Sequence, residues 1–370
     1  MAASTEVIVV GAGIVGAACA EALARDGRRV LVLESRYASA GATSAAMGHI
    51  VIMDDSPAQL ALTAYSRRLW AERAAPWPPD CEDDRCGTLW VAAGEEEMAE
   101  VGRKAERYRS AGLGADVLDG HDLALAEPLL RAGLAGGLLV SEDRVLYPPN
   151  AARQLLQEAA RRGAELREGV QVQALAPREV LTSAGRLRAD LIVNAAGAEA
   201  PLLIPGLSIE PRKGHLLITD RYPGRLRHQV VEFGYLRSAH SLDAESVAFN
   251  VQPRSTGQIL IGSSREFVGW DASVNRPLLA RMLTRATQYM PGLAALNALR
   301  VWTGFRPATP DQLPFIGEWT PGLWLAAGHE GLGITTSLGT GQLLADLMAG
   351  RSPGLEAAPY APRRTMPSTH

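Results

Sequence analysis

Three glycines near the start of the chain have the spacing of a dinucleotide-binding turn. Gly11, Gly13 and Gly16 follow an apolar run at residues 6–10 and precede an alanine-rich segment at residues 17–25. The first glycine permits a tight turn, the second lets the backbone approach a pyrophosphate, and the third lets helix and strand pack closely. Amide groups at the start of the helix then face the phosphates. The pattern predicts a nucleotide site.

An acidic residue marks the ribose end of the same site. Glu34 closes the next apolar run, residues 29–33, where a carboxylate accepts hydrogen bonds from the ribose hydroxyls and repels a 2′-phosphate. Both NAD and FAD fit these features. Around this turn and strand end, the residues expected to contact the cofactor are Gly11, Gly13, Ile14, Val15, Gly16, Glu34, Ser35 and Arg36.

A second glycine-rich turn, at residues 328–333, favours FAD over NAD. It links an apolar run to the last helix of the chain, and the partial positive charge at that helix start stabilises a reduced flavin. A nicotinamide enzyme has no need of this element. No metal site is expected here, because Gly333 stands where a zinc motif beginning at His329 requires its second histidine.

Four short apolar runs are predicted to be the strands that carry these turns. They lie at residues 6–10, 29–33, 189–194 and 323–327. Uninterrupted runs of this length are typical of buried parallel strands. Between residues 211 and 262 the pattern changes to alternating strands with polar turns, which indicates an antiparallel sheet. The expected fold class is α/β (α+β): a Rossmann-like FAD-binding domain with an inserted antiparallel-sheet substrate domain.

Both domains are predicted to be discontinuous in sequence. We assign the FAD-binding domain to residues 1–49, 146–204 and 301–350, and the substrate-binding domain to residues 50–145 and 205–300. The remaining residues, 351–370, are rich in proline and arginine, so we expect a poorly ordered tail.

Composition excludes several other classes of protein. The 37 basic and 40 acidic residues give a net charge of −3, without the basic surface that nucleic acid requires. Three cysteines are too few for a disulfide framework or for the four thiolates of a usual iron–sulfur cluster. No run of apolar residues is long enough to span a membrane, and the N-terminus lacks the basic start of a signal peptide. We therefore expect a cytoplasmic protein.

Five segments carry a resemblance to a known family. They are GAGIVG (11–16) with Glu34, GATSAAMGH (41–49), NAAGA (194–198), GFRPATPDQLPFIG (304–317) and AAGHEGLGITTSLGTG (326–341). In this order they resemble the D-amino-acid oxidase superfamily, which includes glycine oxidase, sarcosine oxidase, the hydrogen cyanide synthase flavin subunit and bacterial D-amino-acid dehydrogenases. The resemblance covers nearly the whole chain. MGHIVIMDDSPAQLAL (47–62) and CGTLW (86–90) are most similar to the flavin subunit of D-hydroxyproline dehydrogenases.

The resemblance implies further contacts with FAD. They would reach the ribityl chain and ring edge, the adenine, and the pyrimidine side of the flavin. The residues are Thr43, Ser44, Ala46, Met47, Gly48, His49, Val172, Ala196, Gly197, Leu332, Gly333, Ile334 and Thr335.

The resemblance also implies a substrate site around Arg306. This residue matches the family's carboxylate-binding arginine, whose planar fork grips a carboxylate in two parallel bonds and fixes the substrate Cα–H over flavin N5. Phe249 stands where the family often has tyrosine, and Glu330 where glycine oxidase has arginine. A glutamate there favours a cationic or hydroxylated substrate over a second carboxylate. Tyr235 is a further polar candidate, and Arg306 and His49 are the candidate catalytic residues.

The activity implied is FAD-dependent oxidation of a small D-amino or imino acid, of the D-proline or cis-4-hydroxy-D-proline type. Hydride passes from the substrate Cα to flavin N5. Fast oxygen reduction in this family often uses a lysine near the flavin, whereas Lys104 and Lys213, the only lysines, lie outside the flavin-facing motifs. This favours a dehydrogenase that passes electrons to a non-oxygen acceptor. We expect an electron-accepting partner subunit, peripheral membrane association through that partner, and an oligomer.

Four alternatives remain at this level. A glycine- or sarcosine-type oxidase would use oxygen. A 2-hydroxy acid dehydrogenase of the same fold would use Arg306 identically. A nicotinamide-dependent enzyme would be colourless when purified, and a flavin-carrying, non-catalytic subunit would leave its FAD unreduced by every amino acid.

Overall fold

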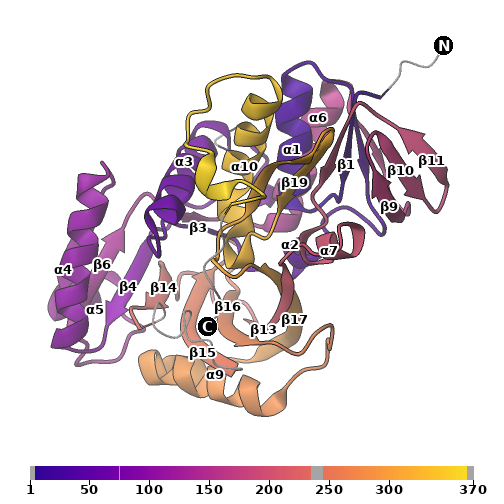
Figure 1. The fold of residues 1–370 in the computed structure, drawn as a ribbon. Helices are drawn as coiled ribbons and strands as arrows, with labels where there is room; N and C mark the ends of the chain where they lie inside the picture. The colour runs from indigo at the N-terminus through magenta and orange to yellow at the C-terminus, as the bar shows by residue number, and fades with distance from the viewer. Residues whose placement is uncertain (1–4, 75, 235–244, 365–370) are drawn as a thin grey trace.

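The four predicted parallel strands are neighbours in one six-stranded sheet. The structure, a computed structural model, describes residues 5–74, 76–234 and 245–364 (Figure 1). The central strands are completely buried, which explains their uninterrupted apolar runs. In sheet order the strands are β18 (Phe315–Thr320), β19 (Leu323–Ala327), β12 (Leu191–Asn194), β1 (Val7–Val10), β2 (Val30–Leu33) and β8 (Glu165–Arg167). Only the edge strand β18 runs antiparallel to its neighbour.

Helices cover one face of this sheet, and a small antiparallel sheet covers the other. The helical side contains α1 (Ile14–Arg25), α3 (Pro57–Arg73), α6 (Pro148–Arg161) and α10 (Gly333–Met348). The opposite side contains α7 (Ala200–Leu203), β9 (Val172–Ala176), β10 (Glu179–Thr182) and β11 (Gly185–Arg188). Helices α1 and α10 approach closely, because a Cβ at Gly341 would lie only 2.5 Å from the carbonyl oxygen of Ala18.

The second unit is built on an eight-stranded sheet. In sheet order its strands are β17 (Ala298–Ala308), β13 (Glu210–Thr219), β16 (Ile259–Glu266), β15 (Glu245–Pro253), β14 (Gln229–Glu232), β4 (Thr88–Ala92), β6 (Gly136–Val140) and β5 (Asp116–Asp119). The sheet is antiparallel as predicted, except that β14 and β4 are parallel. Helices α4 (Glu95–Ser110), α5 (Gly120–Ala126) and α9 (Arg276–Tyr289) pack on it.

Short elements connect the two units. Helix α2 (Ala42–Ala45) is followed by β3 (His49–Ile50), which pairs with β7 (Arg144–Val145). In the described part of the chain, no helix combines the length and apolar character needed to cross a membrane.

Three domain assignments differ from expectation. Strand β17 continues the second sheet to Ala308, so that boundary falls later than residue 301. Helix α3 belongs to the core of the nucleotide unit, because Leu62 and Trp70 contact α10. The segment after residue 350 is also not loose as far as it is described: Tyr360 is buried and its hydroxyl donates to the Ala58 carbonyl at 2.6 Å.

Candidate active site

A cavity of about 800 Å³, here called the long cavity, lies where the two units meet. Its walls come from the carboxyl ends of β1 and β2 on one side and from β13 and β17 on the other. Ligand pockets typically enclose roughly 300–1,000 Å³. Open α/β sheets bind their ligands beyond the carboxyl ends of the strands, so the cavity occupies the expected position.

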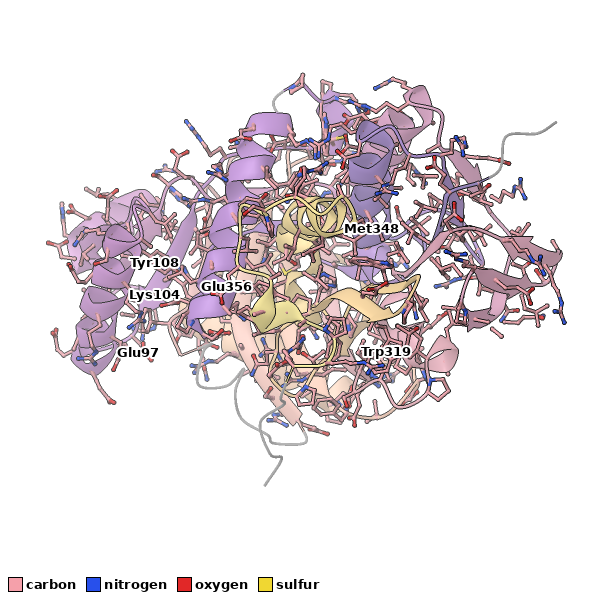
Figure 2. All side chains as sticks on the ribbon, turned by 45° about the horizontal axis from the view of Figure 1, so that its top comes forward. Glu97, Lys104, Tyr108, Trp319, Met348 and Glu356 are labelled. Atoms are coloured by element: carbon pink, nitrogen blue, oxygen red, sulfur yellow. The ribbon has the colours of Figure 1, made fainter. Side chains whose placement is uncertain are left out.

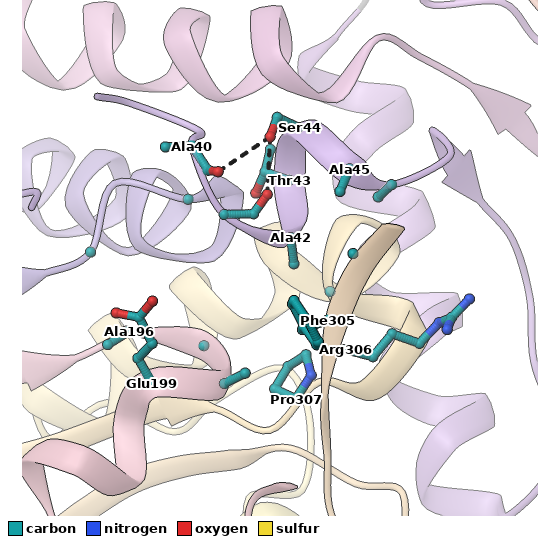
Figure 3. A pocket seen from close by; sticks show the side chains of 18 of the residues that line it. Ala40, Ala42, Thr43, Ser44, Ala45, Ala196, Glu199, Phe305, Arg306 and Pro307 are labelled. Carbon is teal, nitrogen blue, oxygen red and sulfur yellow. Dashed lines mark hydrogen bonds between the residues drawn. The ribbon is translucent and has the colours of Figure 1, made fainter. Parts of the chain in front are cut away.

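Most predicted cofactor residues line this cavity. They are Gly11, Gly13, Ile14, Val15, Glu34, Ser35, Arg36, Thr43, Ser44, Ala46, Met47, His49, Val172, Ala196, Gly197, Gly333 and Ile334. Figure 3 shows α2 facing Phe305 and Pro307 across the cavity. Residues as far apart in the sequence as Gly11 and Ile334 therefore surround one space.

Two helix N-termini open on the long cavity. Neither α1 nor α10 has a side-chain cap or an acidic residue in its first turn. The two starts are adjacent, because a Cβ built at Gly333 would lie 3.8 Å from Cγ2 of Val15. Their partial positive charges therefore act on the same ligand.

Neighbouring backbone leaves no room for side chains at two glycines of the first turn. Gly11 has φ +104°, which favours glycine, and a Cβ there would lie 2.6 Å from the carbonyl oxygen of Ala195. A Cβ at Gly16 would overlap the carbonyl oxygen of Gly11. Gly16 therefore does not line the cavity, and its role is the close packing of α1 on β1.

The carboxylate of Glu34 is fixed at the end of β2. Its Oε2 accepts from the amide of Ala12 at 2.9 Å, and its Oε1 accepts from the amide of Arg36 at 2.9 Å. A fixed acidic group beside a phosphate-binding turn fits a ribose without a 2′-phosphate. Together with the second helix N-terminus and the cavity volume, these residues fit FAD.

Three other predicted cofactor residues lie behind the cavity wall or beside it. Thr335 donates its hydroxyl to the carbonyl of His49 at 2.8 Å, which fastens β3 to α10. The amide of Gly48 donates to Oε1 of Gln252 at 2.8 Å, and a Cβ at Gly48 would overlap the Leu146 carbonyl. Both residues hold the flavin-facing segment in place. Leu332 lines a separate, smaller cavity.

Arg306 lies in the wall of the long cavity on β17. It is opposite Arg212 on β13, and Gly214 is opposite Gly304 on the same pair of strands. A Cβ at Gly214 would overlap the Arg306 guanidinium, so only glycine leaves room for that group over β13. One guanidinium nitrogen donates to the carbonyl of Ser264 at 3.2 Å. In Figure 3 the side chain of Arg306 reaches to the opposite side of the cavity from Glu199.

The smaller cavity, here called the polar chamber, encloses about 80 Å³ and adjoins the long cavity. His49, Asn250, Glu330 and Gly331 line both. The remaining lining residues are Val51, Met53, Asp55, Gln59, Trp90, Arg212, Gln229, Val231, Arg265, Gln312 and Leu332. Glu330 binds Arg212 at 2.9 Å, so this predicted substrate residue is paired with a basic one.

Two buried histidines beside the cavities are neutral. Burial lowers the pKa of His49 to about 3 and the pKa of His329 to about 3. His329 Nε2 lies 3.0 Å from the hydroxyl of Thr340. For Nε2 of His49, no partner is found among the described residues. His49 therefore acts as a neutral hydrogen-bonding group at physiological pH.

One predicted substrate residue lies elsewhere. Phe249 is completely buried in the core of the second unit and stacks on Tyr289, with ring centroids 4.8 Å apart. It does not line either cavity, and its neighbour Asn250 lines both. Phe249 is therefore not a pocket residue, and Asn250 takes that position in the structure. Tyr235 lies outside the described residues.

Several lining residues were not predicted from the sequence. Trp302 donates its indole N–H to the Ala45 carbonyl at 3.0 Å, and Trp270 contacts Phe305 at a centroid distance of 5.2 Å. These residues share strand β17 or the segment that follows β16, and no motif marks them. Arg212 and Gly214 could have been found from strand alternation, because side chains on either side of Lys213 in β13 point to the same face, and that face borders the cavities.

Both lysines are engaged away from the long cavity. The ammonium of Lys104 on α4 (Figure 2) is completely buried against Asp54 and lies 4.5 Å from the Trp90 ring centroid. Lys213 Nζ binds Glu266 at 3.0 Å, on the face of β13 that points away from Arg212 and Gly214. Neither lysine belongs to the cavity lining.

Comparison with known proteins identifies the family. Residues 6–347 match the family model described as DAO, FAD dependent oxidoreductase. The chain belongs to this family. Its expected resemblance to D-amino-acid oxidases is thus confirmed, and FAD is its cofactor.

Similar proteins span the same length as this chain. The glycine oxidase of Pseudomonas aeruginosa is 30% identical, with 97% of this chain and 99% of that protein covered. The hydrogen cyanide synthase subunit HcnC of the same organism is 28% identical, with 98% and 96% covered. The crystal structure of glycine oxidase from Geobacillus kaustophilus superposes with a TM-score of 0.87 at 28% identity, covering 98% of this chain and 99% of that chain. The predicted Rossmann-like fold class is confirmed by this match.

Proposed function

We propose that this flavoprotein oxidises a small D-amino or imino acid at its Cα–N bond, and that D-proline and cis-4-hydroxy-D-proline represent the substrate class. The similarity to a glycine oxidase along the whole chain supports an amino acid substrate. One feature carries the proposal: a guanidinium held at the wall of the FAD cavity.

Arg306 gives the substrate its orientation. Gly214 lies beneath its guanidinium, and a Cβ at Gly331 would lie 3.6 Å from its Nε. These glycines leave room for the planar group at the cavity wall, where it can grip a carboxylate in two charge-assisted bonds. A substrate held by its carboxylate presents one Cα–H bond in a fixed direction. When bound, FAD supplies the acceptor for the hydride that leaves this carbon.

The chain offers no strong base beside Arg306 among the described lining residues. His49, with its pKa lowered to about 3, stays neutral and does not store the amine proton at physiological pH. The substrate therefore binds with a neutral amine, and His49 orients rather than titrates. Arg212 and Glu330 neutralise each other at the boundary between the two cavities.

The positions of the lysines support a dehydrogenase. Each of the two lysines of the chain is held in a carboxylate pair outside the cavity lining. We therefore propose that electrons leave FAD for a non-oxygen acceptor in a partner subunit. HcnC, to which the chain is similar, is a subunit of hydrogen cyanide synthase, and this supports assembly of the protein into a complex.

The test is anaerobic reduction of the purified yellow protein by a panel of substrates. We expect D-proline and cis-4-hydroxy-D-proline to bleach the flavin, and oxygen to reoxidise it slowly. Faster bleaching by glycine or sarcosine with rapid reoxidation would support an oxidase instead. Bleaching by 2-hydroxyglutarate alone would support a 2-hydroxy acid dehydrogenase. If no amino acid bleaches the flavin, the remaining alternative is that the protein is a non-catalytic subunit that carries FAD.

The Arg306→Ala variant tests the carboxylate site. It should retain its bound FAD and lose about 10²- to 10³-fold in kcat/KM, because truncating a buried charged partner costs about 2–5 kcal/mol. The control is Arg281→Ala on α9, whose pair with Glu245 is exposed and which should react like the unmodified protein. Normal turnover of Arg306→Ala would refute the assignment.

A further inference from the structure

A buried polar cluster lies on the face of β13 that points away from the long cavity. Side chains alternate along this strand, so Lys213 and His215 lie on the opposite face from Gly214, which lines the cavity. Both side chains are almost completely buried. They contact polar residues of β16 and the N-cap residue of α9. The anchor cluster, as we call it, consists of Lys213, His215, Ser264, Glu266 and Asn275.

Hydrogen bonds join the members of the anchor cluster. Nζ of Lys213 lies 3.0 Å from Oε1 of Glu266, whose Oε2 accepts from the side-chain amide of Asn275 at 3.1 Å. The backbone amide of Asn275 donates to Nε2 of His215 at 2.9 Å, so this ring nitrogen carries no proton. The ring proton is therefore on Nδ1, which lies 2.8 Å from Oγ of Ser264. Burial lowers the pKa of His215, which favours this neutral form.

The cluster ends at the residue that holds Arg306. The backbone amide of His215 also donates to Oγ of Ser264 at 2.9 Å, so two groups of one residue hold the serine side chain. The carbonyl oxygen of the same serine accepts from the Arg306 guanidinium at 3.2 Å. A Cβ at Gly214 would lie 2.8 Å from this oxygen. Ser264 thus connects the anchor cluster on one face of the sheet to the guanidinium on the other.

Regular strand pairing is interrupted where Ser264 lies. Strands β13 and β16 change register between Lys213 and Leu217. A β-bulge of this kind disrupts the ladder hydrogen bonds and bends the strand. Ser264 is inside the shifted stretch, so the bonds from His215 to its side chain fix its position where regular pairing does not.

Lys213 also holds the chain segment that leads to Asn275. Besides Glu266, its ammonium group binds Asp271 at 3.3 Å and the carbonyl oxygen of Ser273 at 3.1 Å. Taking a charge out of water is costly, and a buried ion pair is often no more stabilising than apolar side chains of similar volume. Stability alone therefore does not account for a buried lysine here. Its contacts instead fix the position of the segment that contacts the histidine ring.

We propose that Lys213 and His215 are positioning residues for Arg306. They act through Ser264, whose carbonyl oxygen holds the guanidinium, and neither of them lines the long cavity. A guanidinium that is already fixed loses little freedom when it binds a carboxylate, and this strengthens binding. The inference rests on the proposed function, because it assumes that Arg306 binds the substrate carboxylate.

The experiment measures carboxylate binding rather than turnover. Purified holoenzyme is titrated with pyrrole-2-carboxylate, a ring carboxylate that has no hydrogen on its Cα to transfer, and the change in FAD absorbance gives Kd. The variants are Ser264→Ala, which removes only the hydroxyl, and Lys213→Met, which removes the ammonium group. Each should retain FAD and raise Kd about tenfold, because a charge-assisted contact loses its fixed geometry. Lys213→Arg keeps the charge and should restore most of the affinity.

A double variant separates positioning from a general effect on the fold. In the Arg306→Ala background there is no guanidinium to position, so the addition of Ser264→Ala should leave Kd unchanged. Two independent effects would instead add. A further rise in Kd in the double variant would overturn the inference.

Lys104→Met is the matched control. Lys104 is the other lysine of the chain, and it is likewise buried and paired with a carboxylate, that of Asp54. It does not line the long cavity, so the loss of its ammonium group should leave Kd unchanged. An equal rise in Kd for Lys104→Met and Lys213→Met would contradict a specific role of the anchor cluster. Should Lys213→Met fail to retain FAD, Ser264→Ala alone decides the question.

The outcomes distinguish this inference from the proposed function. If Arg306→Ala raises Kd and the variants of the anchor cluster bind like the unmodified protein, the positioning role is refuted and the carboxylate site stands. If Arg306→Ala binds pyrrole-2-carboxylate as well as the unmodified protein does, the carboxylate site and the positioning role fall together.

Discussion

At the scale of single residues, burial determines which groups carry charge. His329 is completely surrounded by protein and has no carboxylate partner in the described chain, so its neutral form is the stable one in the fold. Asp143 shows the opposite effect: burial raises the pKa of its carboxyl to about 6 although Arg67 lies 3.1 Å away. Neither pKa shift could be inferred from the residue type alone, because both depend on burial in the fold.

The buried histidines should make the fold sensitive to acid. His329 titrates near pH 3 in the folded state and near 6.5 when unfolded, so the unfolded state binds more protons between these values. Stability is therefore lost as the pH falls below about 6.5, by about 1.4 kcal/mol per pH unit for each such histidine. We expect His329→Gln to show a shallower loss between about pH 6.5 and pH 4 in urea unfolding. Equal slopes for both proteins would contradict the assignment.

At the scale of elements, the best sequence predictions came from local patterns. The strand, turn and helix at residues 7–25 follow from neighbouring residues, because the glycine spacing and apolar runs are both local. Phe249, which the resemblance implied as a substrate residue, lies in the core of the second unit, and β15 changes register between Val247 and Asn250. Both faces of that strand are buried, so alternation of apolar residues does not show which side chains face the cavity. The neighbour of Phe249, Asn250, which was not predicted, lines both cavities.

The pairing of β13 and β17 provides a test that leaves Arg306 itself intact. A Cβ in Gly214→Ala would overlap the guanidinium and force it from its position. We expect normal FAD content and a loss of about 10²-fold in kcat/KM, because a displacement of about 1 Å at a positioning group can cost that much. Gly102→Ala on α4 is the control, since a Cβ there meets no atom within 4 Å. Full activity of Gly214→Ala would show that the position of the Arg306 guanidinium over Gly214 is not required for catalysis.

At the scale of the whole molecule, packing between distant segments was the least predictable feature. Helix α3 follows the flavin loop in sequence and was expected in the substrate domain, but Trp70 donates its indole N–H to the carbonyl of Thr335 at 3.0 Å. The segment after residue 350 likewise returns to the nucleotide unit, where Arg364 binds Asp311 at 2.6 Å. Such contacts depend on shape complementarity between elements far apart in sequence, which composition does not encode.

The C-terminal segment should contribute measurably to stability. Tyr360 is 1% exposed and belongs to the core around α1, so Tyr360→Ala should destabilise the fold by about 3–5 kcal/mol. Thermal unfolding of the holoenzyme measures this as a lower Tm. Tyr37→Ala is the control because Tyr37 is 56% exposed. An unchanged Tm for Tyr360→Ala would mean that the last segment does not secure the nucleotide unit.

The meeting of α1 and α10 at one cavity has a consequence during protein synthesis. The first glycine turn leaves the ribosome early, whereas the helix start that completes the site begins at Gly333. A nascent chain therefore has no complete flavin pocket until the start of α10 has been translated. FAD can bind fully only after that point, and chains terminated before α10 should accumulate without colour and be open to proteolysis.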